Sequence, residues 1–170
     1  DGYGDELGGF QGDDCPTEEG YSNVGTFGCP DGDNDGVSQD GDAFPGDDSQ
    51  WNDTDGDGYG DEANGNRADA FPNDPAEWMD SDADGLGNNA DDFPFDPTQK
   101  VDSDGDGMGD NPMGIEADKF PNDPSQWGDI DGDGYGDNAS GNNSDAFITD
   151  PTQWSDADGD GYGDNPSGRL

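Results

Sequence analysis

The stretch that decides the fold is DTDGDGYGD, residues 53–61, in which acidic residues alternate with small ones. The same pattern, D-x-D-x-D-G-x-x-(D/N/Q), recurs at intervals of 22 or 27 residues, beginning at Asp31, Asp53, Asp80, Asp102, Asp129 and Asp156. A partial copy, DGYGD, occupies residues 1–5 and matches loop positions 5 to 9, counted from the first Asp. Self-similarity at a fixed spacing indicates a repeat architecture in which each unit contacts its neighbours.

A second signature, D-x-F-P-x-D, follows each loop around Phe44, Phe71, Phe93, Phe120 and, with Ile148 in place of Pro, Phe147. Seven residues after each Phe stands Trp51, Trp78, Lys100, Trp127 or Trp154, and we expect the Phe and Trp of one repeat to be in contact. The longer repeats carry five extra residues around Gly65, Gly114 or Gly141, which are typical of surface turns. The predicted units are 1–30 (a partial loop plus a cysteine-linked repeat), 31–52, 53–79, 80–101, 102–128, 129–155 and 156–170 (a partial repeat).

The composition rules out an ordinary hydrophobic core. Only 25% of residues are apolar, and 45 acidic residues face four basic ones, for a net charge of −41. Apolar burial alone cannot offset the ordering entropy of such a chain. The charge disfavours nucleic acid and anionic lipid as partners, and no apolar run is long enough for insertion into a membrane. With Gly and Pro interrupting every segment, we expect irregular chain with little regular secondary structure.

The loop spacing suits calcium, a hard cation that takes six to eight oxygen ligands. Carboxylates at positions 1, 3 and 5, the carbonyl at position 7, an oxygen at position 9 and a closing Asp at position 12 or 17 can converge on one ion. The bland alternative is a solvated acidic face, but six loops in register disfavour it. The absence of His argues against zinc and copper, and the carboxylate-rich cage argues against magnesium.

The candidate calcium ligands are the residues at these positions throughout the chain. They are Asp1, Asp5, Asp13, Asp31, Asp33, Asp35, Val37, Asp42, Asp53, Asp55, Asp57, Tyr59, Asp61, Asp69, Asp80, Asp82, Asp84, Leu86, Asn88, Asp91, Asp102, Asp104, Asp106, Met108, Asp110, Asp118, Asp129, Asp131, Asp133, Tyr135, Asp137, Asp145, Asp156, Asp158, Asp160, Tyr162 and Asp164. We expect at least one Ca²⁺ for each complete loop.

The chain resembles the thrombospondin type 3 repeat family. The resemblance rests on tandem DxDGDGxGD loops with a later Asp, and above all on CPDGDNDGVSQDGDAFP, residues 29–45. It implies a chain that wraps around a row of calcium ions, so the expected fold is a calcium-stabilised tandem-repeat rod or solenoid of Asp-rich loops. Animal members carry a cysteine in most repeats, whereas Phe and Trp dominate here, which leaves the wrap and the ion count per repeat open.

Cys15 and Cys29 are the two cysteines, and aligning the repeats places them in the Phe and Trp slots. The alternative is a pair of free thiols, but we expect a disulfide and an extracellular or cell-surface location. Three sequons, at Asn52, Asn138 and Asn142, are candidate glycosylation sites, although such matches also arise by chance.

Two functions remain open. The first is an extracellular structural protein, a calcium-binding stalk or filament segment whose partners are flanking repeats or further copies of itself. The chain begins and ends inside repeats, which favours a segment of a longer array. The alternative is a calcium-dependent adhesion module that recognises a protein or glycan. Because the acidic pairs are better explained as metal ligands and no His is present, we expect no enzymatic activity.

Overall fold

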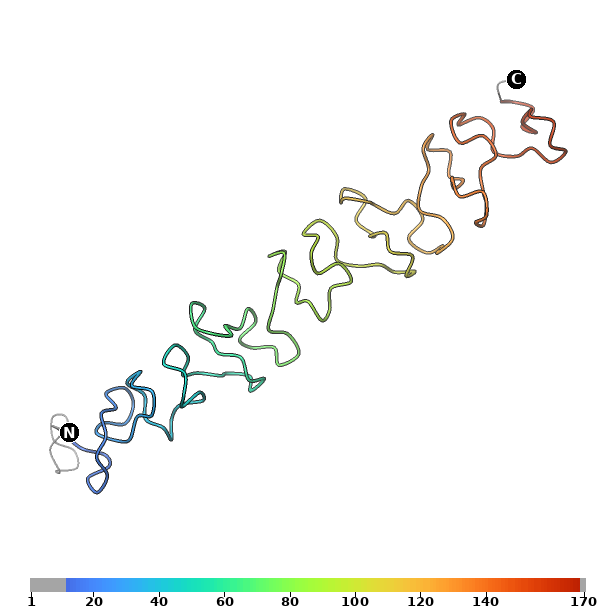
Figure 1. Cartoon of the computed structure of the whole chain (residues 1–170). Coiled ribbons are helices and arrows are strands. Elements are labelled where there is room, and N and C mark those ends of the chain that lie inside the picture. The colour runs from blue at the N-terminus through green and yellow to red at the C-terminus, as the bar shows by residue number, and fades with distance from the viewer. Residues whose placement is uncertain (1–11, 169–170) are drawn as a thin grey trace. The chain divides into compact units, whose positions relative to one another are not determined.

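The structure, a computed structural model, describes residues 12–168, so the predicted ligands Asp1 and Asp5 lie outside the described residues. Within 12–168 there is no helix and no extended strand. Figure 1 accordingly draws the chain as a plain tube that turns through successive loops. Regular pairing is limited to isolated parallel bridges, namely Val24 with Val37, Gly60 with Ala68, Gly109 with Ala117 and Gly136 with Ser144. The prediction of an irregular fold is confirmed.

The chain divides into two compact units, Asp1–Asp80 and Ser81–Leu170. Each unit is described by itself, and the loop that begins at Asp80 starts in the first unit and continues in the second. Within each unit the same local hydrogen bonds recur from one repeat to the next.

A tight corner follows each Asp loop. The closing carboxylate of Asp69 accepts a hydrogen bond from the Phe71 amide at 2.7 Å, and the Asp74 amide donates to the Phe71 carbonyl at 2.8 Å. The returning chain is held by the Ala70 amide, which donates to the Trp78 carbonyl at 3.1 Å. The Phe-Pro signature therefore encodes a reversal that brings the end of each repeat back beside its closing Asp.

Two of the Trp rings stack on the Tyr ring of the preceding loop. Trp78 lies parallel to Tyr59 with ring centroids 5.1 Å apart, and Trp154 lies in the same way over Tyr135, also at 5.1 Å. Both Tyr residues occupy loop position 7. The stacked partner of Trp78 is thus Tyr59, where the sequence led us to expect Phe71, because the corner carries the Trp back to the loop itself.

The interior of each long repeat is polar. The largest fully buried side chains include Gln50, Gln99, Gln126 and Gln153, whereas Cys29 is the one buried hydrophobic residue in the described part of the chain. The Gln50 carboxamide accepts from the Glu62 amide at 2.9 Å and donates to the carbonyls of Glu62 and Asn66, both at 3.0 Å. Every hydrogen-bonding group of the amide except one lone pair is therefore satisfied, which is what a buried amide requires.

Glycine makes room for each buried Gln. A Cβ added at Gly60 would lie 2.0 Å from the Gln50 Oε1 atom, and one at Gly65 would lie 2.5 Å from its Nε2 atom. Real Cβ atoms do not approach other atoms this closely, so a side chain at either position would expel the Gln. The glycines of the longer loops are thus required by packing against the preceding repeat.

The five-residue insert and the buried Gln occur together. Gln50, Gln99, Gln126 and Gln153 each stand just before a loop that carries the insert, whereas Gly28 and Glu77 stand before the short loops at Asp31 and Asp80. The insert is therefore more than the surface turn that the sequence predicted: its carbonyls receive the Gln of the repeat before it. The buried Gln and its hydrogen bonds to the insert of the next repeat, named the Gln plug from here on, join adjacent repeats.

We predict that Gln126→Glu destabilises the chain in calcium-containing buffer. The substitution removes the Nε2 donor from the carbonyls of Asn138 (3.0 Å) and Asn142 (2.8 Å) and adds a buried charge. The free energy of unfolding in urea should fall by about 2 kcal/mol or more. Asn122→Asp, which adds the same charge at an exposed position outside the Asp loops, should change it by less than about 0.5 kcal/mol. Equal losses in the two variants would contradict this role of Gln126.

Candidate metal centre

The first Asp of each loop shapes the backbone. Asp53 accepts from the Gly56 amide through Oδ1 at 2.7 Å and from the Gly58 amide through Oδ2 at 3.1 Å. Gly56 and Gly58 have φ of 83° and 92°, a left-handed conformation that favours glycine. The Asp53 carboxylate therefore holds the backbone of residues 54–58 in a tight curl.

The Asp residues at positions 3 and 5 each use one oxygen for the loop. Asp55 Oδ1 accepts from the Asp57 amide at 3.2 Å, and Asp57 Oδ1 accepts from the Tyr59 amide at 2.8 Å. The same bond, from the amide of position 7 to the carboxylate of position 5, holds Val37, Tyr59, Leu86, Met108, Tyr135 and Tyr162.

The second oxygens of these carboxylates are buried and have no hydrogen-bond partner in the described chain. In the repeat 53–79 they belong to Asp55, Asp57 and the closing Asp69, whose side chain is almost fully buried. The equivalent oxygens elsewhere are those of Asp33, Asp35, Asp91, Asp104, Asp106, Asp118, Asp131, Asp133 and Asp145. An isolated buried carboxylate is costly unless a cation or donors compensate it.

The first three carboxylates of a loop converge. Their oxygens lie within 4.8 Å of one another in the triplets Asp31–Asp33–Asp35, Asp53–Asp55–Asp57, Asp102–Asp104–Asp106 and Asp129–Asp131–Asp133. These triplets could hold a metal ion, and the buried oxygens of the same loops supply the donor atoms. All the donors are oxygens, the ligand type of hard cations.

The pKa of the closing Asp is raised in several repeats. Burial raises the pKa of Asp69, and the nearby carboxylates of Asp57 and Asp55 raise it further, against the lowering effect of the Phe71 amide. Asp42, Asp118 and Asp145 have raised pKa values for the same reasons, burial first. A cation among these oxygens would reverse the shifts.

The residues at position 9, which the sequence predicts as ligands, accept hydrogen bonds from the start of their own loops. Asp61 accepts from both the amide and the hydroxyl of Thr54 at position 2, and Asp110 accepts in the same way from Ser103. Asn88, Asp137 and Asp164 also accept from the amide at position 2 of their own loops. Position 9 therefore fastens the start of the loop, a role that only the folded geometry reveals.

Three predicted ligands near the ends repeat the pattern. Asp13 is almost fully buried and accepts from the Cys15 amide at 2.8 Å, as a closing Asp does. Asp156 accepts from the Gly159 and Gly161 amides, as a first Asp does, and Asp158 accepts from the Asp160 amide at 3.2 Å. The loop geometry thus continues to the last described repeat.

Lys100 provides a contact that the sequence did not predict. Its Nζ atom donates to the Asp84 carbonyl at 2.8 Å and lies 3.2 Å from the Asp84 Oδ1 atom. The ammonium group neutralises one oxygen of position 5 from the Trp slot of the same repeat. Lys100 is the one cation that forms an ion pair in the described chain. The only sign of this contact in the sequence is that Lys100 takes the place that Trp occupies in the other repeats.

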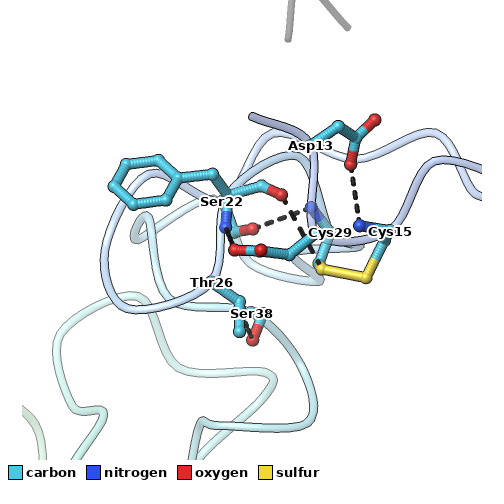
Figure 2. The surroundings of a disulfide bond; sticks show 8 residues. Asp13, Cys15, Ser22, Thr26, Cys29 and Ser38 are labelled. Atoms are coloured by element: carbon cyan, nitrogen blue, oxygen red, sulfur yellow. Dashed lines mark hydrogen bonds between the residues drawn. A yellow bond between two sulfur atoms is a disulfide. The ribbon is translucent and has the colours of Figure 1, made fainter. Parts of the chain in front are cut away.

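The disulfide is confirmed. Cys15 and Cys29 are bonded, with Cα atoms 5.0 Å apart, and both cysteines are accounted for. Figure 2 shows the Cys29 amide pointing to Ser22, whose Oγ atom accepts at 2.9 Å, and the Cys15 amide pointing to Asp13. The covalent link therefore fixes the chain beside the buried Asp13 carboxylate.

The three sequons differ in environment. Asn138 is half-buried, and its Nδ2 atom donates to the Ser125 carbonyl at 2.8 Å, as Asn111 does to Thr98. Asn52 and Asn142 are exposed, although both side chains also make a hydrogen bond. A glycan would project freely from Asn142 or Asn52, whereas Asn138 serves the insert.

No family model matches the chain, and no curated protein matches it. Among residues 12–168, there is no helix that could cross a membrane.

We predict that the metal-free chain is stabilised by acid. The pKa of Asp69 is raised above 3.8, the ordinary value for an Asp side chain, so the folded loop binds more protons than the unfolded chain. That stability is fully present below about pH 3.8 and is lost as the pH rises through the higher folded pKa. Near-ultraviolet circular dichroism of the Trp–Tyr stacks in chelator should therefore strengthen on acidification from pH 7.

Asp69→Asn should mimic the protonated form and strengthen the same signal at pH 7. Asp47→Asn is the matched control, because hydrogen bonds from Ser49 lower the pKa of Asp47, so neutralising it should not stabilise the chain. A metal-free signal that weakens on mild acidification would contradict the assignment of strain to the closing Asp residues.

Proposed function

We propose that the chain binds calcium at its Asp loops and acts as a calcium-stiffened structural segment of an extracellular protein. The observation that carries the proposal is the set of buried carboxylate oxygens, three in the repeat 53–79, that have no hydrogen-bond donor. Folding these loops without a cation would concentrate negative charge in a poorly solvated space, so ion binding and folding are coupled.

Calcium fits this donor set better than other metals. Positions 1, 3 and 5 and the closing Asp supply at least four carboxylates, and the position-7 carbonyl is the further ligand suggested by the loop spacing. Magnesium favours a near-ideal octahedron that retains several waters, and zinc prefers sulfur and nitrogen donors. The chain has no His, and its two cysteines form a disulfide.

The structural role is supported by the way repeats are joined. The Gln plug links consecutive repeats by direct hydrogen bonds, and each insert closes on an Asp that is a candidate ligand. An ion in one loop therefore stiffens the receptor for the preceding repeat. This arrangement suits a calcium-stabilised solenoid or rod of the thrombospondin type 3 kind, and the disulfide suits an oxidising, extracellular location.

An adhesion module is the second candidate. Met113 and Ile115, in the insert of the repeat 102–128, are 93% and 63% exposed. The equivalent insert positions elsewhere are occupied by Asn64, Asn66, Ser140 and Asn142, so this repeat alone presents large apolar side chains there. We propose binding and no catalysis for either role.

We predict that Asp118→Asn removes one ion from the calcium stoichiometry or weakens one site at least about tenfold, ~1.4 kcal/mol. Asn retains the acceptor for the Phe120 amide but lacks the buried charge. Asp40→Asn, with the same charge change at an exposed residue, is the control and should leave the titration unchanged. Isothermal titration calorimetry of both variants distinguishes a specific site from diffuse attraction, for which the two losses would be equal.

Chelation should expand the chain. With the cations removed, the carboxylates of each triplet repel one another and the loops open. The radius of gyration from small-angle scattering should rise clearly in EDTA and return when calcium is added, but magnesium at the same concentration should restore it only in part. A radius that is the same in calcium and in EDTA would refute the proposed coupling of folding to calcium.

A further inference from the structure

The two Tyr–Trp stacks differ in what lies over the Tyr ring. In the repeat 53–79, the Arg67 guanidinium lies 4.7 Å from the centroid of Tyr59, the ring that also stacks on Trp78. A guanidinium over an aromatic face is attracted by the ring quadrupole, and its planar shape suits stacking. The Tyr59 ring is therefore covered by a cation, Arg67, from its own repeat.

The repeat 129–155 has the same backbone without that cover. The residue equivalent to Arg67, fourteen residues after the first loop Asp, is Asn143. Both residues have a left-handed backbone, with φ of 49° at Arg67 and 46° at Asn143. The Tyr135–Trp154 stack also reproduces the 5.1 Å spacing of the first stack. At this position the guanidinium is replaced by a short amide, which carries no charge.

A groove of about 450 Å³ lies at this place in the repeat 129–155. Its lining includes Tyr135, Trp154, Asn143, Ser144 and Ser155. Tyr135 and Trp154 are half-buried and Asn143 is exposed, so the aromatic surface can be reached from solvent. The lining also includes Asp156, so the groove combines a pre-formed aromatic pair with polar side chains and an acidic residue, as small binding sites do.

We propose that this groove binds an arginine side chain from a basic segment of a protein partner. The repeat 53–79 supplies the precedent, because there a guanidinium lies over the equivalent ring. The net charge of −41 would attract a basic segment from a distance, and this chain has only four basic residues of its own. The partner's guanidinium would stack on Tyr135 while Asn143, Ser144 and Ser155 accept its hydrogen bonds.

The test uses the full chain in saturating calcium, with the Trp indoles labelled by ¹⁵N. The probe is acetyl-Gly-Arg-Gly-amide, and the matched control peptide carries citrulline, which has the same shape but no charge. The Arg peptide should shift the Trp154 indole resonance, and the citrulline peptide should bind at least about tenfold more weakly. Equal responses to the two peptides, or no response at Trp154, would overturn the proposal.

Three variants make the assignment specific. Asn143→Arg should fill the groove from within and abolish the shift of Trp154, and Tyr135→Leu should abolish it by removing the ring; Leu is the natural residue at position 7 of the repeat 80–101. Arg67→Asn should create a new response at Trp78. A Trp154 shift that survives in Asn143→Arg would refute the site.

Calcium calorimetry of each variant separates this proposal from the proposed metal binding, because none of the three substitutions removes a carboxylate. Unchanged calcium binding in a variant shows that its loops remain folded. A neutral sugar, methyl glucoside, is titrated in parallel. A Trp154 shift with the sugar and none with the Arg peptide would identify a glycan site and overturn the arginine proposal.

Discussion

Mutual repulsion among buried carboxylates is the constraint on which the rest of the structure depends. In the loop 53–61, Asp55 and Asp57 each use one oxygen to hold the backbone, and the other oxygen is buried without a hydrogen-bond partner. The backbone bonds alone would favour the curled loop, but the buried charged oxygens oppose it. A chain of this kind has two stable responses: it opens, or it takes up cations.

The polar interior follows from the same constraint. A chain with so few apolar residues cannot bury hydrocarbon between its loops, so the junctions are built from hydrogen bonds instead. The Gln126 side chain takes the place that a buried Leu has between the repeats of an ordinary repeat protein. Its hydrogen bonds are directional, so they form in one register only. Specificity between neighbouring repeats thus comes from a buried amide, at the cost of requiring glycine at Gly136 and Gly141.

Much of this was accessible from the sequence, and the failures have physical causes. The loop period, the irregular chain and the Cys15–Cys29 bond follow from spacing and composition, because metal loops and turns are locally encoded. The stack of Trp78 on Tyr59 was missed because it depends on the path of the returning chain. The role of Gln50 was missed because an amide in a polar sequence looks like surface, although its recurrence before every insert was a usable signal. The hydrogen bond from Thr54 to Asp61 was missed because it depends on side-chain geometry, which the spacing of the residues does not give.

The Gln plug also fixes where such a chain can be cut and rejoined. Deleting residues 129–155 would place Gln126 before the loop at Asp156, whose insert carries the glycine and carbonyl partners, so the junction could re-form. Deleting residues 53–79 would instead place Gln50 before the loop at Asp80, which lacks the insert. We therefore expect a shortened array to keep its junctions only where a Gln still precedes a loop that carries the insert.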